Sequence, residues 1–190
     1  MKKLILASGS PRRKELLGEL GYQFEVVLSP AEEVHDHEME LVELCELNGA
    51  LKGRAVLEMH PDAVVLAGDT LVYIDETPLG KPKSEQEAVE MLRRLSGKEH
   101  SVCSGMCLCE HGREVRFHEV TKVLFKELDD ETIREYMRKV DVMDKAGAYA
   151  VQEHGEMIIE KLIGDYSNVV GMPQKLVDER LRAFGLKPGA

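Results

Sequence analysis

The sequence predicts an α/β fold built on a mixed β-sheet. Short apolar runs typical of buried strands alternate along the chain with longer segments in which apolar residues recur at helical spacing. One hairpin interrupts this alternation, because two strand-like runs flank the tetrapeptide Glu110-His111-Gly112-Arg113. Alternation alone favours parallel strands and the hairpin adds antiparallel pairing, so we expect both in one sheet flanked by helices.

The first half of the chain contains two expected helices. One spans residues 11–20, with Ser10 as its N-cap and Pro11 as its first residue. The other runs from about Glu38 to Met59, where His60-Pro61 stops it. Strands are expected at Leu4–Ala7, Phe24–Leu28 and Val64–Ala67, with a further apolar run at Leu71–Ile74.

The second half of the chain has three expected helices around the hairpin. Ser84 and Glu87 form a capping box that begins the first, and Asp129 or Asp130 caps the second. Pro173 opens the last. In order, the elements are a helix to Leu95, the hairpin strands Ser101–Cys109 and Glu114–Phe125, a helix to about Lys139 and a helix to Phe184.

Length and composition limit the class of protein. A chain of 190 residues, 43% hydrophobic and 32% charged, can bury a core, and we expect a single domain over residues 1–190. The net charge of −10 argues against binding along a nucleic-acid polymer, which requires a basic face. No apolar run approaches the ~20 residues of a membrane-spanning helix. The four cysteines do not resemble a disulfide framework, which predicts a reducing, cytoplasmic location.

The N-terminal segment combines a strand, a turn of small residues and a helix start, in Leu4–Ala7 followed by Ser8-Gly9-Ser10-Pro11-Arg12-Arg13. Free backbone N–H groups and the positive end of the helix dipole point at one spot in such an arrangement, which favours an anion. Arg12 and Arg13 add forked donors suited to phosphate. The alternative is an ordinary helix start with two solvated arginines. Arginine is unfavourable beside the positive N-terminal end of a helix dipole, so two arginines at this position indicate a bound anion.

Asp69 is the strongest candidate for acid–base or metal chemistry. It follows a buried strand in Gly68-Asp69-Thr70, and carboxylates at strand ends in open α/β sheets face the ligand crevice. There it can bind Mg²⁺ or accept a proton from water. The alternative is a turn aspartate that bonds its own backbone. Glu32 and Glu33, in an acidic connection, either complete an oxygen-rich metal site with Asp69 or are solvated acids.

Two lysines and one glutamine are further candidates for ligand contacts. Lys52 lies beside the apolar stripe of the long helix, so it either snorkels to solvent or points at an anion. Lys81 lies between Gly80 and Pro82 on a constrained loop that can aim its charge, with a solvated lysine as the alternative. Gln152 ends an apolar run. Its amide either matches the N3–H and O4 of uracil or thymine or is a polar group at a strand end.

In this order, the segments around these residues resemble those of the Maf proteins, nucleoside triphosphate pyrophosphatases once described as septum-formation inhibitors. The matching segments span nearly the whole chain, and their joint match is highly specific. They are Leu6–Arg13, Ala67–Val72, Gly80–Pro82, Thr121–Val123, Asp144–Tyr149 with Gln152, and Gly164–Pro173.

The resemblance implies an inosine-triphosphatase-like fold, with two lobes around a central cleft and an ability to form homodimers. It also implies hydrolysis of a nucleoside triphosphate to the monophosphate and pyrophosphate with a divalent metal, Mg²⁺ or Mn²⁺. Asp69 corresponds to the general base that activates water for attack at the α-phosphorus, and Glu33 to its acidic partner for the metal. The implied triphosphate contacts are Ser8, Arg12, Arg13, Lys52 and Lys81.

One branch of that family acts on dTTP and UTP, and another on 7-methyl-GTP. Arg12, Thr70 and Gln152 resemble the specificity residues of the pyrimidine branch, which implies dTTP, UTP or modified pyrimidine triphosphates as substrates. The chain departs from the pattern where Glu153-His154 replaces a usual glycine and Cys103 a common threonine, which bears on base preference more than on the reaction. A 7-methyl-GTP pyrophosphatase and a nucleotide-binding regulator of septum formation without turnover stay open as alternatives. An intact general base favours the enzyme.

Overall fold

The structure, a computed structural model, describes residues 2–36 and 38–189 as two compact units. The first unit comprises the chain up to Thr70, Ser104–Glu119 and the chain from Gly171 onward. The second comprises Leu71–Cys103 and Val120–Val170. Three of the strands contain a boundary between the units, so the backbone passes from one unit to the other within regular structure.

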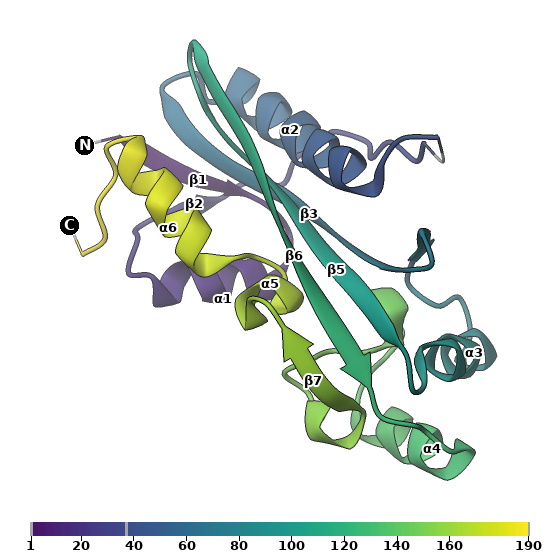
Figure 1. The fold of residues 1–190 in the computed structure, drawn as a ribbon. Helices are drawn as coiled ribbons and strands as arrows, with labels where there is room; N and C mark the ends of the chain where they lie inside the picture. Colours follow the sequence, from purple (N-terminus) through teal and green to yellow (C-terminus); the bar gives the residue numbers. More distant parts are fainter. Residues whose placement is uncertain (1, 37, 190) are drawn as a thin grey trace. The chain divides into compact units, whose positions relative to one another are not determined.

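Among the described residues, seven strands form one mixed sheet (Figure 1). Their bounds are β1 (Lys3–Ala7), β2 (Glu25–Val26), β3 (Ala63–Ile74), β4 (Thr77–Leu79), β5 (Glu99–Glu110), β6 (Arg113–Phe125) and β7 (Ile159–Ile163). The order is β2-β1-β3-β5-β6-β7, and β4 pairs with β3 outside this path. β1 is parallel to β2 and β3, whereas β4 is antiparallel to β3 and β7 to β6. The predicted α/β fold with a mixed sheet flanked by helices is therefore confirmed.

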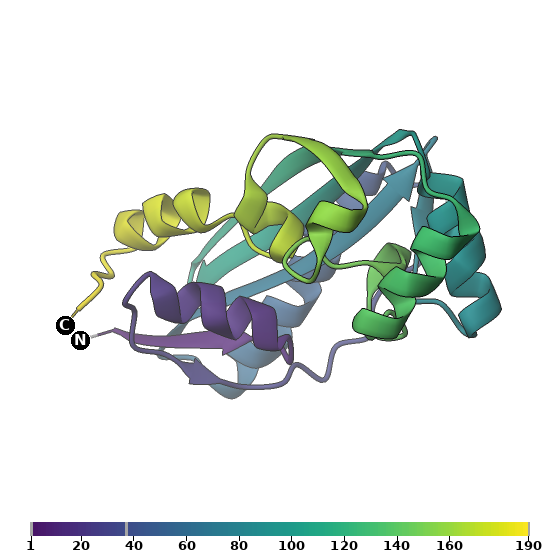
Figure 2. The same cartoon turned by 90° about the horizontal axis from the view of Figure 1, so that it is seen from below.

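In the first unit, helices cover both faces of the sheet. α2 (Leu41–Met59) packs against the face formed by alternate residues of β1, β3 and β5. The buried residues of this contact are Ile5, Ala7, Ala50, Val56, Ala63, Val65, Ala67, Cys107 and Cys109. Side chains alternate along a strand, so Leu6 and Leu66 point to the opposite face. Figures 1 and 2 show α1 (Pro11–Glu19) and α6 (Gln174–Ala183) on that side.

The start of α1 agrees with the prediction. Pro11 is its first residue, and Ser10 Oγ accepts a hydrogen bond from the Arg13 N–H at 3.3 Å, as an N-cap does. The helix ends at Glu19, one residue before the predicted end. Gly21 follows with a φ of +79°, which glycine adopts without strain.

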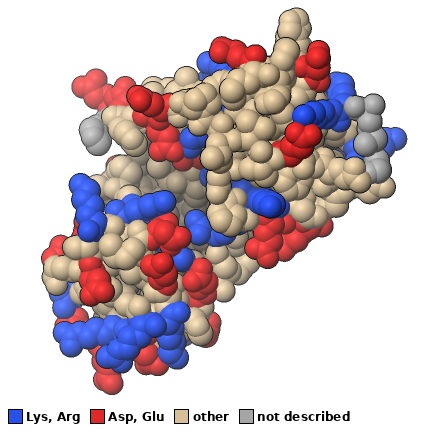
Figure 3. All heavy atoms as spheres, turned by 180° about the vertical axis from the view of Figure 1, so that it is seen from behind, with Lys and Arg blue, Asp and Glu red and all other residues tan. Residues whose placement is uncertain are grey.

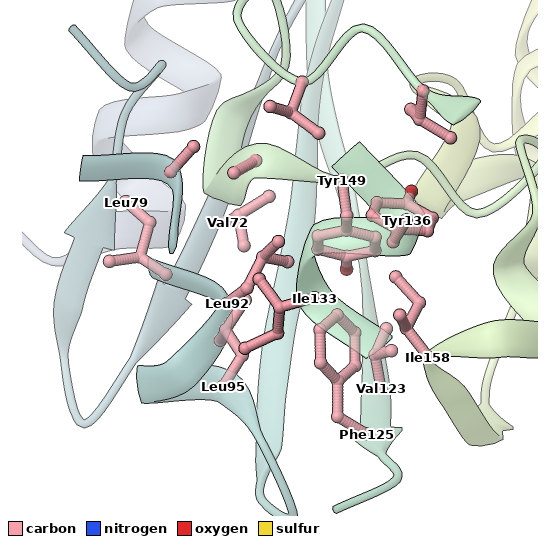
Figure 4. Close-up of a cluster of buried hydrophobic side chains, with 14 of the residues drawn as sticks. Val72, Leu79, Leu92, Leu95, Val123, Phe125, Ile133, Tyr136, Tyr149 and Ile158 are labelled. Atoms are coloured by element: carbon pink, nitrogen blue, oxygen red, sulfur yellow. The ribbon is translucent and has the colours of Figure 1, made fainter. Parts of the chain in front are cut away.

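The second unit has its own core, drawn in Figure 4. α3 (Glu85–Leu95) contributes the fully buried Leu92 and Leu95, and α4 (Asp130–Lys139) contributes Ile133 and Tyr136. The predicted hairpin of β5 and β6 supplies Val123 from its second strand. The short elements of this unit are the 3-10 helices η1 (Ala146–Ala148) and η2 (Gly155–Met157) and the helix α5 (Tyr166–Val170).

Three aromatic rings meet edge to face in this second core. The ring centroids of His100, Phe125 and Tyr149 lie 4.9 to 5.4 Å apart. His100 Nε2 and the Tyr149 hydroxyl form a hydrogen bond of 2.7 Å, whereas His100 Nδ1 has no partner among the described residues. Burial lowers the pKa of His100 to about 4, so the ring is neutral at pH 7.

Asp69 lies inside a strand and not after one. The sequence predicts a strand end before Gly68-Asp69-Thr70, and this prediction is wrong because β3 continues through all three residues. Gly68 serves close packing instead of a turn, since a Cβ there would lie 2.5 Å from Met106 Sδ. A continuous strand holds the Asp69 backbone more firmly than a turn would, because its peptide groups belong to a sheet ladder.

Other boundaries also differ from the prediction. β2 covers only Glu25–Val26 of the predicted five residues, because its parallel pairing with β1 spans just the residues opposite Ile5 and Leu6. α2 begins at Leu41, later than predicted, and its N-cap Glu40 makes no side-chain capping bond. The sequence does not predict β7. Most residues of this strand are exposed at the edge of the sheet, so the sequence there shows only a short apolar stretch.

The surface carries charges of both signs. On the face drawn in Figure 3, acidic and basic side chains are interspersed. No helix within residues 2–36 and 38–189 is long and apolar enough to cross a membrane. All four cysteines are buried thiols.

The buried His100 makes the stability of the protein depend on pH. Its pKa is lower in the folded chain than the ordinary 6.5, so the unfolded chain binds more protons between about pH 6.5 and pH 4 and stability falls as the pH falls through this window. We expect the native chain to lose about 3 kcal/mol more unfolding free energy than His100→Gln between pH 7 and pH 4. Urea titrations at several pH values measure this. Parallel pH curves for the two proteins would contradict it.

Candidate active site

α2 runs close to the sheet beside Asp69 because glycines line the contact. A Cβ on Gly49 would lie 3.1 Å from the Gly105 carbonyl oxygen, and a Cβ on Gly105 would overlap the backbone of Cys45. The Cys45 thiol donates a hydrogen bond to the Asp69 carbonyl at 3.1 Å, which joins the helix to β3 directly. Residues one and two turns further along α2 therefore lie alongside Asp69.

The Asp69 carboxylate is buried, with 9% of the residue exposed, and three groups surround it. Its Oδ1 accepts the Thr70 N–H at 3.0 Å, and its Oδ2 accepts Asn48 Nδ2 at 3.4 Å. Lys52 Nζ lies 3.7 Å from Oδ1. Burial raises the pKa of Asp69 and the Lys52 charge opposes that rise. The predicted alternative, an aspartate bonded to its own backbone, describes only one of these contacts.

Lys52 joins Asp69 to a second carboxylate. Its Nζ contacts Glu33 Oε1 at 2.5 Å as well as Asp69 Oδ1 at 3.7 Å, and only 17% of the lysine side chain is exposed. Of the two interpretations of Lys52, the structure supports an ammonium directed at anions over one that snorkels into solvent. The Glu33 side chain is 41% exposed, and its hydrogen bond with Lys52 lowers the pKa of Glu33.

Glu33 and Asp69 together fit a magnesium or manganese ion that arrives with a phosphate ligand. The described residues contain no cluster of three or more His, Cys, Asp or Glu side chains suited to a metal, so a closed protein site is absent there. Mg²⁺ usually takes one or two carboxylates and completes its shell with water and substrate phosphate oxygens. Both carboxylates approach the same Lys52 ammonium, so they lie around one positive charge in the structure.

Arg13 is bound almost entirely within the protein. Its Nε donates to the Gly171 carbonyl at 2.8 Å and its Nη1 to the Gly68 carbonyl at 3.0 Å. Its Nη1 also contacts Ser8 Oγ at 3.3 Å, and its Nη2 donates to Thr70 Oγ1 at 2.8 Å. Burial lowers the pKa of Arg13, and the charge of Asp69 opposes that effect. The guanidinium thus ties the start of α1 to β3 and to the loop before α6.

Thr70 and Ser8 belong to the same network. The Thr70 hydroxyl lies 2.9 Å from Ser104 Oγ and accepts the bond from Arg13. Ser8 Oγ accepts the Ser10 N–H at 3.2 Å as well as the bond from Arg13. Both hydroxyls therefore have protein partners in the structure, and their predicted contacts with a nucleotide stay predictions.

Arg12 differs from its neighbour. It is half-buried on the first turn of α1, and its guanidinium has no hydrogen-bond or ion-pair partner within residues 2–36 and 38–189. Pro11 has no N–H and the Arg13 N–H is capped by Ser10, so Arg12 is the residue of this turn whose backbone donor is left for an anion. The expected anion site at this helix start therefore centres on Arg12.

Lys81 and Gln152 lie in the second unit. Lys81 is exposed and follows Gly80, whose carbonyl accepts the Gly147 N–H at 3.1 Å. Gln152 is exposed in a turn that follows η1, and not at a strand end. A backbone hydrogen bond thus joins the loop that contains Lys81 to η1, which precedes the turn of Gln152. The roles of the Lys81 and Gln152 side chains stay predictions.

Asn48 is a site residue that the sequence interpretation missed. It is 2% exposed on the buried face of α2, between Cys45 and Lys52, and it donates to Asp69. A single amide among buried apolar positions of a helix is the signal that could have marked it, because a buried amide requires partners. The partner itself comes from another part of the chain and cannot be deduced from helix spacing.

Comparison with known proteins gives consistent matches over nearly the whole chain. A family model described as "Maf-like protein" matches residues 3–184. A relative from Akkermansia muciniphila is 46% identical over 184 residues, 97% of each chain. Relatives from Deinococcus radiodurans and Bacillus velezensis are 45% and 41% identical, and the matches cover 97% and 98% of this chain and 94% and 98% of theirs. All three relatives are named dTTP/UTP pyrophosphatase.

The two neighbouring arginines should respond differently to substitution. Arg13→Lys keeps the charge but cannot reproduce four directed hydrogen bonds, so it should destabilise the fold by about 3 kcal/mol. Arg12→Lys is the matched control and should change stability by less than about 0.5 kcal/mol. Urea unfolding of both variants decides this. Equal stability of the two variants would show that the Arg13 network does not hold the first unit together.

Proposed function

The chain belongs to the Maf family, and we propose that it is a nucleoside triphosphate pyrophosphatase that hydrolyses dTTP and UTP. The products are the nucleoside monophosphate and pyrophosphate. The names of the relatives support this substrate class. The observation that carries the proposal is the buried Asp69 carboxylate, which lies beside the Lys52 ammonium and the Asn48 amide.

In the proposed reaction, Asp69 is the general base. One carboxylate oxygen takes a proton from water as the water oxygen bonds to the α-phosphorus. The bond from the α-phosphorus to the bridging oxygen breaks, and pyrophosphate leaves with the electron pair. The raised pKa of Asp69 suits this role, because a more basic carboxylate accepts a proton more readily.

The cationic side chains bind the triphosphate and stabilise the charge that develops on it. We assign this role to Arg12, Lys52 and Lys81, with Ser8 at the same helix start. Arg13, also predicted as a phosphate contact, holds Ser8 and the Gly68 carbonyl in place and retains at most one N–H donor for an anion. Its main contribution is therefore to shape the binding site.

Glu33 and Asp69 would hold the divalent cation, Mg²⁺ or Mn²⁺. When bound, such a cation neutralises phosphate charge and polarises the reacting phosphoryl group. Lys52 contacts both carboxylates, so it keeps them from repelling each other before a nucleotide and its cation bind.

The base preference is assigned to Arg12, Thr70 and Gln152. Gln152 offers a donor and an acceptor side by side, which match the N3–H and O4 of uracil or thymine. The Thr70 hydroxyl is hydrogen-bonded to Arg13 and Ser104. We therefore infer that Thr70 affects base preference indirectly, by positioning these neighbouring residues.

We further infer that residues 1–190 act as one functional domain in the cytoplasm and that the chain forms a homodimer. The buried thiols support a reducing compartment. The family match over residues 3–184 supports one functional domain. Light scattering on purified protein measures the mass of the assembly, and a monomer at micromolar concentration would contradict the dimer.

Pyrophosphate release tests the proposed function directly. With Mg²⁺ or Mn²⁺, dTTP and UTP should be turned over in preference to CTP, GTP, ATP and 7-methyl-GTP. Turnover of 7-methyl-GTP alone would keep the reaction and overturn the base preference. Nucleotide binding without any turnover would replace the enzyme by a nucleotide-binding regulator.

Removal of the general base should abolish turnover and spare binding. Asp69→Asn keeps the size of the side chain but cannot take a proton from water, so kcat should fall by about 10³-fold. The Kd of a non-hydrolysable UTP analogue, measured with saturating metal, should change little. Asp62→Asn, at an exposed position of the same unit, is the control. Full activity of Asp69→Asn would remove the assigned role.

Loss of the Gln152 amide should change base preference more than rate. Gln152→Ala should lower kcat/KM for UTP and reduce the ratio of UTP to GTP turnover by about tenfold, the worth of one or two hydrogen bonds. Gln86→Ala, another exposed glutamine of the second unit, is the matched control. An unchanged ratio in Gln152→Ala would move base recognition to other residues.

A further inference from the structure

The Asn48 side chain pairs with both backbone polar groups of one residue in another segment. Asn48 Oδ1 accepts the Val34 N–H at 2.7 Å, and Asn48 Nδ2 donates to the Val34 carbonyl at 3.0 Å. The amide thus satisfies both backbone groups of Val34, as a neighbouring strand would. Its second N–H is directed to Asp69 Oδ2 at 3.4 Å.

Besides the bonds from Asn48, few contacts among the described residues hold the segment that contains Val34, and one of them is the ion pair of Glu33 with Lys52. Residues 29–36 form neither helix nor strand, so no ladder of backbone hydrogen bonds positions them. Ser29 Oγ donates to the Lys52 carbonyl at 3.0 Å at one end of the segment. Near the other end, the two bonds from Asn48 fix Val34, the residue directly after Glu33.

Asn48 therefore bonds to both sides of the carboxylate pair. It holds the backbone next to Glu33 and the carboxylate of Asp69 from one rigid helix, one turn before Lys52. An apolar side chain would suit the packing at this position, since Leu44 and Cys45 beside it are buried. It would leave the Val34 backbone unpaired and Asp69 without its amide donor.

We propose that Asn48 is a positioning residue that sets the distance between the Glu33 and Asp69 carboxylates and so controls the affinity of the site for a divalent cation. The inference rests on the proposed function, which assigns the cation to these two carboxylates. We do not assign Asn48 to the cation itself, because its Oδ1 accepts from Val34 and its Nδ2 donates to Val34 and Asp69.

Affinity for Mn²⁺ without nucleotide, measured by electron paramagnetic resonance, tests this. Asn48→Leu should weaken binding by about tenfold or more, the usual effect of losing a group that orients a metal ligand. Glu33→Gln should also weaken it. In a double-mutant cycle, the effects of Asn48→Leu and Glu33→Gln should be less than additive, because the two shorter Asn48 bonds hold the backbone next to Glu33 and only the longer one reaches Asp69.

Hydrogen exchange supplies a readout that does not depend on metal. The Val34 amide should exchange faster in Asn48→Leu than in the native chain, and Glu33→Gln should leave it protected because that variant keeps the Asn48 bonds. If leucine does not fit the site, Asn48→Ala removes the same hydrogen bonds with a smaller side chain.

The outcomes separate the two hypotheses. If Glu33→Gln weakens Mn²⁺ binding but neither Asn48 variant does, the inference is overturned and the proposed function stands. If Glu33→Gln also leaves Mn²⁺ binding unchanged, the metal assignment fails and the inference fails with it. Unchanged exchange at Val34 in a folded Asn48 variant would also overturn the inference, since the Asn48 hydrogen bonds would then not hold that segment.

Discussion

The contacts at the centre of the first unit are organised around one buried carboxylate. Asp69 is 9% exposed inside a strand, and a buried charge requires partners. Lys52 and Asn48 provide them from α2, and they reach Asp69 because Gly49 and Gly105 let the helix lie against the sheet. The proposed chemistry uses the same arrangement, since a carboxylate that is held in place and removed from bulk water is prepared to accept a proton.

Two adjacent arginines illustrate how position decides the role of a charge. Arg13 is buried and donates to two carbonyls and two hydroxyls, so it joins the start of α1 and the loop before α6 to β3 on either side of Asp69. Arg12, one residue earlier, is half-buried and takes no part in that network of hydrogen bonds. Helical geometry explains the difference, because successive residues are turned by about 100° and cannot share a face. Neighbouring positions on one helix turn therefore do not give two arginines the same contacts, and the phosphate contacts predicted for both stay predictions.

The fold was largely predictable because its signals are local. The N-cap at Ser10, the hairpin around Gly112 and the alternation of strands with helices all depend on neighbouring residues. The predicted turn at Gly68 was wrong because the sequence alone does not distinguish a glycine needed for close packing from a glycine needed for a turn. The contacts of Asn48 and Arg13 were not predictable either. They join residues far apart in the sequence, so only the fold brings them together. The roles of Lys81 and Gln152 rest on family resemblance, since an exposed loop residue carries no packing signal.

The measurement that tests the central claim most directly is hydrolysis of UTP in water enriched in oxygen-18. Water activated by Asp69 and directed at the α-phosphorus would place one labelled oxygen in the nucleoside monophosphate and none in the pyrophosphate. Mass spectrometry of both products gives the answer after a single turnover. Label in the pyrophosphate would mean attack at the β-phosphorus, and the account of Asp69 as the base for attack at the α-phosphorus would be wrong.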